Sequence, residues 1–172
     1  MIEVIEDFIT DDELDQFQEI VKSGRWHWGQ RSNNNTMFPM WYQPYYGKGA
    51  WEDWVPRTVK EVAYRFVNSL PRGSQLQRAM LSGNTFGQDG DIHRDWQDAG
   101  CKTMVLFVNK TWNIHWEGET VIYTPELDVL QTVLPIPKRA VAFDSNLPHI
   151  GKDPARRCGE LRTILAIQAK LP

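Results

Sequence analysis

From residue 76 onward the sequence is divided into short segments with the composition of β-strands. Strands are predicted at residues 76–81, 90–96, 102–109, 119–123, 129–134, 139–143 and 161–169. Glycine, proline, asparagine or aspartate stands in each of the breaks between them. Many short strands separated by turn residues are typical of an antiparallel sandwich or barrel. This pattern constrains the chain to a mainly β fold.

Two helices are predicted before these strands. Thr10 and Glu13 have the spacing of a capping box, in which each side chain binds the backbone N–H of the other residue, and a helix ending near Gly24 follows. A second helix is predicted at about residues 52–70, where apolar residues recur every three or four positions. Helices that precede a run of strands are expected to pack on one face of it. The predicted fold class is therefore α+β, mainly β, with two N-terminal helices on one face.

The length and composition of the chain fit one domain. With 172 residues, of which 41% are hydrophobic, the chain can bury a substantial core. We expect a single domain over residues 1–172, with a helical and aromatic part at about 1–75 and a β-rich part at about 76–170. The net charge of −3 argues against nucleic acid as a partner, and neither a polybasic block nor a long apolar run points to a membrane.

The two cysteines and the N-terminus bear on the expected compartment. Cys101 and Cys158 are too few for a disulfide framework and are expected to be free thiols in a reducing environment. The acidic start of the sequence lacks the basic and apolar regions of a signal peptide. The expected location is the cytoplasm.

Residues 25–54 form a segment of unusual composition. It contains five of the eight tryptophans and has no regular hydrophobic period. A long irregular segment in a compact domain is commonly a functional loop or lid, and the alternative is a layer that covers the outside of the core. In the first case Trp41 and Tyr45 would lie on the substrate side of a pocket.

His93 and Asp95 are the first candidate site residues. Side chains two apart on a β-strand point to the same face, and one His with one carboxylate makes two thirds of the facial triad that binds non-haem Fe(II). The alternative is a surface strand with two solvated side chains. His149 follows the strand predicted at 139–143, and a jelly roll can return it to the same point. For His115 we favour a place in a loop or at a pocket rim over a ligand role.

Arg162 is the second unusual residue. It begins an otherwise apolar strand that alternates poorly, which predicts burial on both faces. A buried guanidinium needs an anionic partner, and its planar fork suits a carboxylate. The alternative is a structural salt bridge to Glu160 or Asp144.

Together these motifs resemble the Fe(II)/2-oxoglutarate-dependent oxygenases of the prolyl-hydroxylase type. The resemblance covers about residues 76–170 and rests on segments 90–95, 104–109 with Trp112, 116–120 and 139–143, followed by His149 and Arg162. It implies a double-stranded β-helix (jelly-roll) core in which His93, Asp95 and His149 hold iron. It also implies that 2-oxoglutarate chelates the iron and places its distal carboxylate on Arg162.

The same resemblance implies the reaction. O2 and 2-oxoglutarate would be consumed, with release of succinate and hydroxylation of a C–H bond in a peptidyl (prolyl) residue or a small molecule. Ascorbate is a candidate reductant. Related halogenases have a small residue in place of Asp95, so the intact carboxylate favours a hydroxylase. The candidate substrate contacts are Trp41, Tyr45, Trp96, Trp112 and His115.

The sequence departs from the family pattern in two places. The usual GGE reads Glu117-Gly118-Glu119, and Asn84, Thr85 and Phe86 stand where the family often has Tyr. Rival functions are a cupin-like metal-binding protein, a zinc hydrolase with the same three ligands, and a catalytically silent small-molecule sensor. The cupin and hydrolase alternatives leave Arg162 unexplained.

Overall fold

A computed structural model of the chain describes residues 2–33 and 37–172. Two α-helices are present in this part, α1 (Asp11–Lys22) and α2 (Arg57–Ser69), with a short 3-10 helix at Ile114–Trp116. The strands are β1 (Ile2–Ile5), β2 (His27–Gln30), β3 (Met40–Gly47), β4 (Ala50–Trp51), β5 (Gln75–Asn84), β6 (Cys101–Phe107), β7 (Thr120–Tyr123), β8 (Val129–Val133), β9 (Ala140–Asp144), β10 (His149–Gly151) and β11 (Arg162–Lys170).

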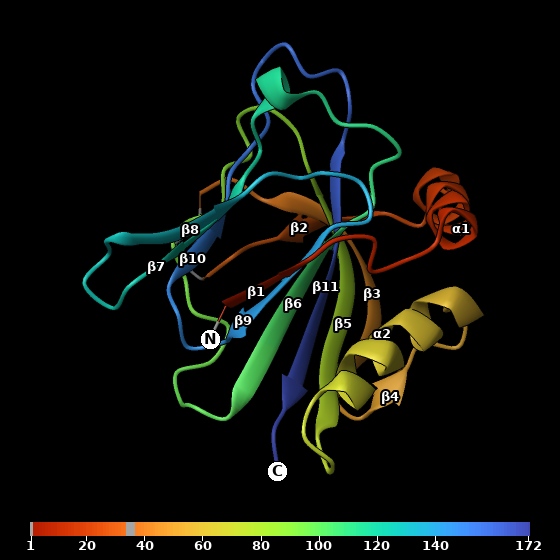
Figure 1. Cartoon of the computed structure of the whole chain (residues 1–172). Coiled ribbons are helices and arrows are strands. Elements are labelled where there is room, and N and C mark those ends of the chain that lie inside the picture. Colours follow the sequence, from red (N-terminus) through yellow and green to blue (C-terminus); the bar gives the residue numbers. More distant parts are fainter. Residues whose placement is uncertain (1, 34–36) are drawn as a thin grey trace.

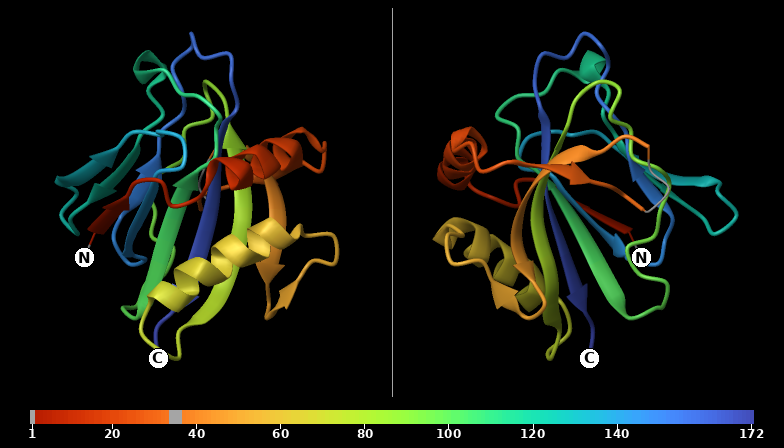
Figure 2. Two further views of the ribbon diagram at one scale, coloured as in Figure 1. Left: turned by 45° about the vertical axis from the view of Figure 1, so that its right-hand side comes forward. Right: turned by 180° about the vertical axis from the view of Figure 1, so that it is seen from behind.

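The described strands form two antiparallel sheets. The larger sheet has eight strands in the order β1-β9-β6-β11-β5-β3-β2, with β4 paired to β3. The smaller sheet has the order β10-β7-β8. The smaller sheet lies on one side of the larger sheet and both helices lie on the other (Figures 1 and 2). The prediction of a mainly β fold with two helices on one face is confirmed.

Alternation along the central strands builds two cores, one on each face of the larger sheet. On β11, Leu165 and Ile167 belong to the cluster under the helices, whereas Ile164 packs with the cluster between the sheets. Phe17 of α1 and Val62 of α2 are fully buried in the helix-side cluster. Burying an aliphatic or aromatic side chain of this size contributes about 1.5–3 kcal/mol, so this cluster fixes the helices on the sheet.

The start of each helix is set by the residues at its N-terminus. The capping box predicted for α1 is present: Glu13 N–H donates to Thr10 Oγ1 at 3.2 Å, and Thr10 N–H donates to Glu13 Oε2 at 2.9 Å. Helix α2 starts at Arg57, five residues after the predicted start at 52. The reason is that Ala50 and Trp51 pair with β3 as a strand, and Pro56, which has no N–H to donate, precedes the first helical turn.

Two predictions about strands were wrong. No strand was predicted in residues 25–54, yet apart from residues 34–36, which lie outside the described part, this segment contributes β2, β3 and β4 to the larger sheet. Trp26, Trp51 and Trp54 pack against the core under the helices, which agrees with the core-cover alternative. Register shifts at Trp28/Gln30 and Pro44/Tyr46 interrupt the alternation. Residues 90–96 do not form a strand, because only His93 pairs there, in a single bridge with His149. The other predicted strands are present, with shifted ends.

Cys101 and Cys158 are both free thiols. Within the described ranges, no helix is both long enough and apolar enough to cross a bilayer.

Candidate metal centre and its cavity

Three side chains converge between the two sheets. One ligand atom from each of His93, Asp95 and His149 lies within 4.8 Å of the others. The Nε2 of His93 is 3.7 Å from Asp95 Oδ1, and the Nε2 of His149 is 3.6 Å from Asp95 Oδ2. His149 is buried, whereas His93 and Asp95 are partly exposed. The structure thus brings together the three residues that the sequence singled out.

Backbone hydrogen bonds hold these residues in place without a regular strand at residues 90–96. His93 N–H donates to His149 O at 3.0 Å, and His149 N–H donates to His93 O at 2.9 Å. Asp95 N–H donates to Ser145 O at 3.1 Å. Because β10 also pairs with β7, the loop that carries His93 and Asp95 is attached to the smaller sheet at the point where His149 enters it.

Each histidine is oriented through its second ring nitrogen. The Nδ1 of His93 lies 2.8 Å from Asp91 O, and the Nδ1 of His149 lies 3.0 Å from Leu147 O. A carbonyl oxygen only accepts, so Nδ1 carries the proton in both rings and the Nε2 lone pairs face Asp95. Burial lowers the pKa of His149, although the negative charge of Asp95 acts in the opposite direction. The lowered pKa favours the neutral imidazole, which is the form that binds metals.

The carboxylate is held by residues that the sequence did not indicate. Thr103 Oγ1 donates to Asp95 Oδ2 at 2.6 Å and lies 2.8 Å from Ser145 Oγ. Thr103 was detectable only as the polar residue on the inner face of a strand that otherwise carries Val105 and Phe107 there. Two imidazoles and one fixed carboxylate are the donor set of non-haem Fe(II) sites and also suit Zn²⁺.

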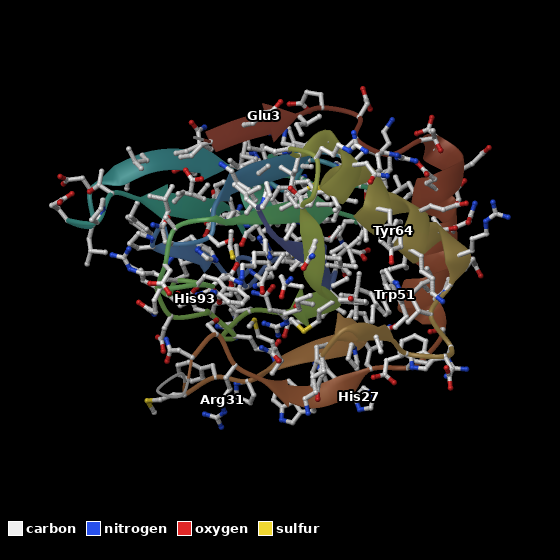
Figure 3. The ribbon with its side chains drawn as sticks, turned by 90° about the horizontal axis from the view of Figure 1, so that it is seen from below. Glu3, His27, Arg31, Trp51, Tyr64 and His93 are labelled. Atoms are coloured by element: carbon white, nitrogen blue, oxygen red, sulfur yellow. The ribbon has the colours of Figure 1, made fainter. Side chains whose placement is uncertain are left out.

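A cavity of about 130 Å³ extends from this cluster across the inner face of the larger sheet. The metal-binding cluster and its support line one end of the cavity: His93, Asp95, Thr103 and His149. The opposite end is lined by Asn84, Thr120, Gly151 and Arg162. Side chains between the two ends include Met40, Met80, Ser82 and Ile164. His93 and Arg31, another lining residue, lie on the same side of the molecule, away from Trp51 and Tyr64 (Figure 3).

Arg162 lies almost completely buried in this cavity, with 2% of its surface exposed. Its Nε donates to Gly118 O at 2.5 Å and its Nη2 donates to Thr120 Oγ1 at 3.0 Å. Burial lowers the pKa of Arg162 to about 10, while Glu119 and Asp89 act in the opposite direction. The guanidinium therefore remains charged at neutral pH.

The structure does not show the structural salt bridge that was the alternative role for Arg162. Among the described residues Arg162 forms no ion pair with a carboxylate, and Asp144 pairs with Lys102 at 2.5 Å. A Cβ added at Gly151 would lie 3.5 Å from Arg162 Nη1, so the absence of a side chain there keeps this end of the cavity open. A buried cation beside open space fits a ligand carboxylate.

The turn below Arg162 contains the departure from the GGE pattern. Glu117, in place of the first glycine, has φ +58° and ψ −137°, a conformation that glycine adopts more easily than other residues. At Gly118, with φ +80°, an added Cβ would lie 3.1 Å from both Arg162 Cδ and Trp112 Cζ2. The turn therefore has a glycine-like backbone without the first glycine.

None of the five predicted substrate contacts lines the cavity itself, and four of them also lie away from its mouth. Tyr45 is fully buried in the core under the helices, because the side chains on this face of β3 point away from the metal ligands. Trp41 packs against Trp28 with ring centroids 4.8 Å apart. Trp112 donates from Nε1 to Glu117 O at 2.9 Å and so supports the turn under Arg162. His115 is exposed on the 3-10 helix.

The residues that do face the cavity come from the neighbouring positions of β3. Met40 lines the cavity, and Tyr42 and Pro44 line a hollow of about 430 Å³ at its mouth. Trp96, the fifth predicted contact, also lines this mouth. Because side chains alternate along a strand, the prediction identified the correct segment but the wrong face.

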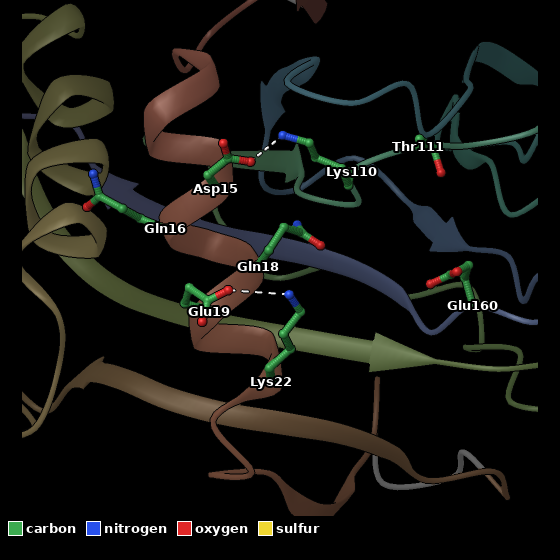
Figure 4. Close-up of a pocket in the computed structure, with 8 residues that line it drawn as sticks. All are labelled: Asp15, Gln16, Gln18, Glu19, Lys22, Lys110, Thr111 and Glu160. Atoms are coloured by element: carbon green, nitrogen blue, oxygen red, sulfur yellow. Dashed lines mark hydrogen bonds and ion pairs between the residues drawn. The ribbon is translucent and has the colours of Figure 1, made fainter.

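A separate hollow of about 550 Å³ runs along α1 (Figure 4). Four of its five charged residues pair with one another: Lys110 with Asp15, and Lys22 with Glu19 at 3.3 Å. These side chains are more than half exposed, and exposed pairs of this kind are common on protein surfaces. The smaller cavity with the three converging ligands is therefore the candidate functional site.

The fold was compared with known proteins. No family model and no curated protein sequence matches the chain. Among solved structures, a prolyl hydroxylase from Trichoplax adhaerens, in complex with a hypoxia inducible factor peptide fragment, matches with a TM-score of 0.72 and 18% identity over 98% of this chain and 83% of that one. A Pseudomonas putida prolyl-4-hydroxylase matches with a TM-score of 0.67 and 15% identity over 99% of this chain and 92% of that one.

A third structure is described by its family. It is a 2OG-Fe(II) oxygenase family protein from Burkholderia pseudomallei, with a TM-score of 0.73 and 9% identity over 98% of this chain and 84% of that one. All three likenesses extend over almost the whole of this chain. The chain has the prolyl-hydroxylase-like fold of the 2-oxoglutarate- and Fe(II)-dependent oxygenases.

Proposed function

We propose that this protein is an Fe(II)- and 2-oxoglutarate-dependent dioxygenase that hydroxylates a C–H bond in a peptidyl residue, such as proline, or in a small molecule. The proposal rests on a single cavity. A His-Asp-His cluster lies at one end of it, and at the other end lies Arg162, which is buried and forms no ion pair with a carboxylate of the described residues. Bound Fe(II) and 2-oxoglutarate would supply oxygen activation, with decarboxylation of 2-oxoglutarate to succinate and oxidation of the substrate.

His93, Asp95 and His149 would hold the iron through two Nε2 atoms and one carboxylate oxygen. The backbone carbonyls of Asp91 and Leu147 keep both imidazoles in the correct tautomer. Thr103 keeps one oxygen of Asp95 oriented by donating to it. Three protein ligands on one face of a metal leave positions for the co-substrate and oxygen.

Arg162 would bind the distal carboxylate of 2-oxoglutarate. Its Nε and one Nη are already fixed by Gly118 O and Thr120, so the remaining N–H groups are oriented before the ligand arrives. Asn84 pairs with Arg162 across β5 and β11 and lines the same cavity. Its Nδ2 donates to Gln88 O at 3.3 Å and to Lys152 O at 3.4 Å, so Arg162 is the main donor that we assign to the distal carboxylate.

The carboxylate of Asp95 favours hydroxylation over halogenation, because it occupies the iron position that halide would need. A zinc hydrolase would use the same three ligands, but such a site has no role for a buried cation at the far end of its cavity. For this reason we favour the oxygenase function over the zinc hydrolase function.

The metal assignment is tested by anaerobic titration of the protein with Fe(II) and then with 2-oxoglutarate. We expect stoichiometric iron binding and a weak visible charge-transfer band when the keto acid chelates the iron. His93→Ala, Asp95→Ala and His149→Ala should each lose iron binding and the band, whereas His115→Ala, an exposed control, should retain both. If His149→Ala kept full activity while His115→Ala lost it, the third ligand would be His115. Metal binding without any response to 2-oxoglutarate would favour the zinc hydrolase.

The co-substrate assignment is tested at Arg162. Arg162→Lys keeps the charge but loses the paired hydrogen bonds, so 2-oxoglutarate affinity should fall. Arg162→Met should weaken it further, by roughly 2–3 kcal/mol, as expected when a charged hydrogen-bonded pair is lost. Iron content should be unchanged in both variants. An unaltered 2-oxoglutarate dependence in Arg162→Met would move the anchor elsewhere, with Arg157 as the first alternative.

A further inference from the structure

A second arginine, Arg78, stands at the boundary between the metal cavity and its mouth. It lines both hollows. On the larger sheet Arg78 of β5 is in register with Gln168 of β11, and Gln168 is in register with Thr103 of β6. Neighbouring strands lie about 4.8 Å apart, so roughly 10 Å separates the backbone of Arg78 from that of Thr103, the residue that holds Asp95. Arg78 therefore lies two strands away from the residue that holds Asp95, where the cavity and its mouth meet.

The guanidinium of Arg78 has no anionic partner within the described residues. Its hydrogen bond is from Nη2 to Met80 Sδ at 3.3 Å, and a thioether is a weak acceptor. Ion pairs with carboxylates are formed by Arg57, Arg65 and Arg139; Arg78 differs from the other arginines of the described part in lining both the cavity and its mouth. An unpaired guanidinium in a cavity wall indicates that a ligand supplies the missing anion.

The rest of the mouth supports this interpretation. Of the described residues that line it, Lys48 is a second cation and none is Asp or Glu. A hollow lined by charges of one sign concentrates ligands of the opposite sign. Tyr42, Pro44 and Trp96 provide apolar and aromatic walls, and Trp96 is 37% exposed. The mouth therefore combines two cations with surfaces that suit a hydrocarbon or ring.

We propose that the prime substrate carries a carboxylate that binds Arg78, while its hydrocarbon part lies against Tyr42 and Trp96 and presents a C–H bond to the metal cluster. This inference rests on the proposed oxygenase function and specifies its substrate. In this arrangement Arg162 and Arg78 bind two different carboxylates at opposite ends of one cavity: that of 2-oxoglutarate at the closed end and that of the substrate at the open end. The carboxylate belongs either to a free organic acid or to an acidic residue of a peptide.

The test uses acids and their uncharged amides as probes. Protein loaded anaerobically with Fe(II) and saturating 2-oxoglutarate is titrated by calorimetry with phenylacetate and N-acetylproline, and with the matching carboxamides. A capped tripeptide with a central Glu, and its Gln counterpart, form the peptide arm. We expect an acid to bind at least about tenfold more tightly than its amide, the size of effect that one charge-assisted hydrogen-bonded pair gives. The arm that shows this preference identifies the source of the carboxylate.

Variants assign the preference to the residue. Arg78→Gln should bind acid and amide equally, Arg78→Lys should keep part of the preference, and Arg72→Gln, an exposed arginine just before β5, should keep all of it. The charge-transfer band with 2-oxoglutarate should persist in all three, which shows that they are folded. If the unsubstituted protein showed no charge-transfer band with Fe(II) and 2-oxoglutarate, the oxygenase function itself would be refuted. A normal band with equal binding of acids and amides in both arms would overturn the Arg78 proposal alone, as would loss of the band in Arg78→Gln, since Arg78 would then bind 2-oxoglutarate.

Discussion

At the scale of single residues, Glu117 is the position where sequence and backbone conflict. Its φ of +58° with ψ −137° costs a residue with a side chain roughly 1–3 kcal/mol. Glycine avoids this cost but loses about 0.5–1 kcal/mol through its greater freedom in the unfolded chain. Glu117→Gly should therefore raise the free energy of unfolding by about 1 kcal/mol, measured by urea denaturation.

The neighbouring glycine provides the matched control for this prediction. Gly118→Ala should lower stability, because the new Cβ would meet Arg162 and Trp112 at 3.1 Å in a backbone with φ +80°. It should also weaken 2-oxoglutarate binding, since Gly118 O holds Arg162. If Glu117→Gly were destabilising, the Glu117 side chain would have a favourable role that outweighs the backbone strain.

Residues with unusual chemistry could be identified from the sequence, and residues whose role depends on register could not. Histidine is rare in this chain, His93 and Asp95 stand two positions apart, and Arg162 begins an otherwise apolar strand, so these residues could be singled out. Thr103 and Arg78 are ordinary polar residues of β6 and β5. Their importance follows from the pairing of both strands with β11, which no local pattern specifies.

At the scale of elements, the start of α1 is linked to α2 by a charge pair. Glu13 receives hydrogen bonds from Arg65 of α2, with Arg65 Nη2 at 2.5 Å from Oε1, and from the backbone N–H of Thr10. The hydrogen bond from Arg65 lowers the pKa of Glu13, against the opposing effect of burial. Because the folded state binds the proton less tightly than the unfolded state, the ion pair stabilises the fold above the ordinary pKa of Glu, and this contribution is lost as pH falls through the folded-state pKa.

Glu13→Gln isolates this charge effect, because Gln can still complete the capping box. We expect it to lower the free energy of unfolding by about 1 kcal/mol at pH 7 and to differ progressively less from the unsubstituted protein as pH falls below 4.5. Urea denaturation between pH 3 and 7 measures the difference. Glu19→Gln, which removes an exposed pair with Lys22, should have little effect at any pH. A Glu13→Gln effect that did not change with pH would indicate that packing, not charge, is lost.

Elements with uninterrupted periods were predicted well, and those with irregular periods were not. The start of α1 was found from the spacing of Thr10 and Glu13, and the central strands β6 and β11 were found as apolar runs bounded by turn residues. Strands β2 and β3 were missed because register shifts break the alternation and aromatic side chains occupy both faces. The face of Tyr45 was mistaken because the alternation of β3 was not recognised: Gln43 and Tyr45 are buried on the helix side, whereas Tyr42 and Pro44 line the mouth.

At the scale of the whole molecule, the candidate site joins the two sheets. His149 belongs to the smaller sheet, while Arg162 and Thr103, the partner of Asp95, belong to the larger one. A metal held by His149 and Asp95 would therefore connect the sheets, and a co-substrate extending to Arg162 would add a second connection. Ligands that bind only the folded state stabilise it by mass action.

This linkage predicts stepwise thermal stabilisation. At about one hundred times the dissociation constant a ligand contributes about 2.7 kcal/mol, and each kcal/mol raises the melting temperature of a chain of this size by about 2–4 °C. Mn²⁺, used as a redox-stable substitute for Fe²⁺, should therefore raise the melting temperature by roughly 5–10 °C, and 2-oxoglutarate should raise it further only when the metal is present. Arg162→Met should keep the metal step and lose the 2-oxoglutarate step, whereas His149→Ala should lose both and Arg72→Met should keep both. A 2-oxoglutarate step that survived in His149→Ala would show that the co-acid binds independently of the metal, and the shared cavity would then hold two unconnected sites.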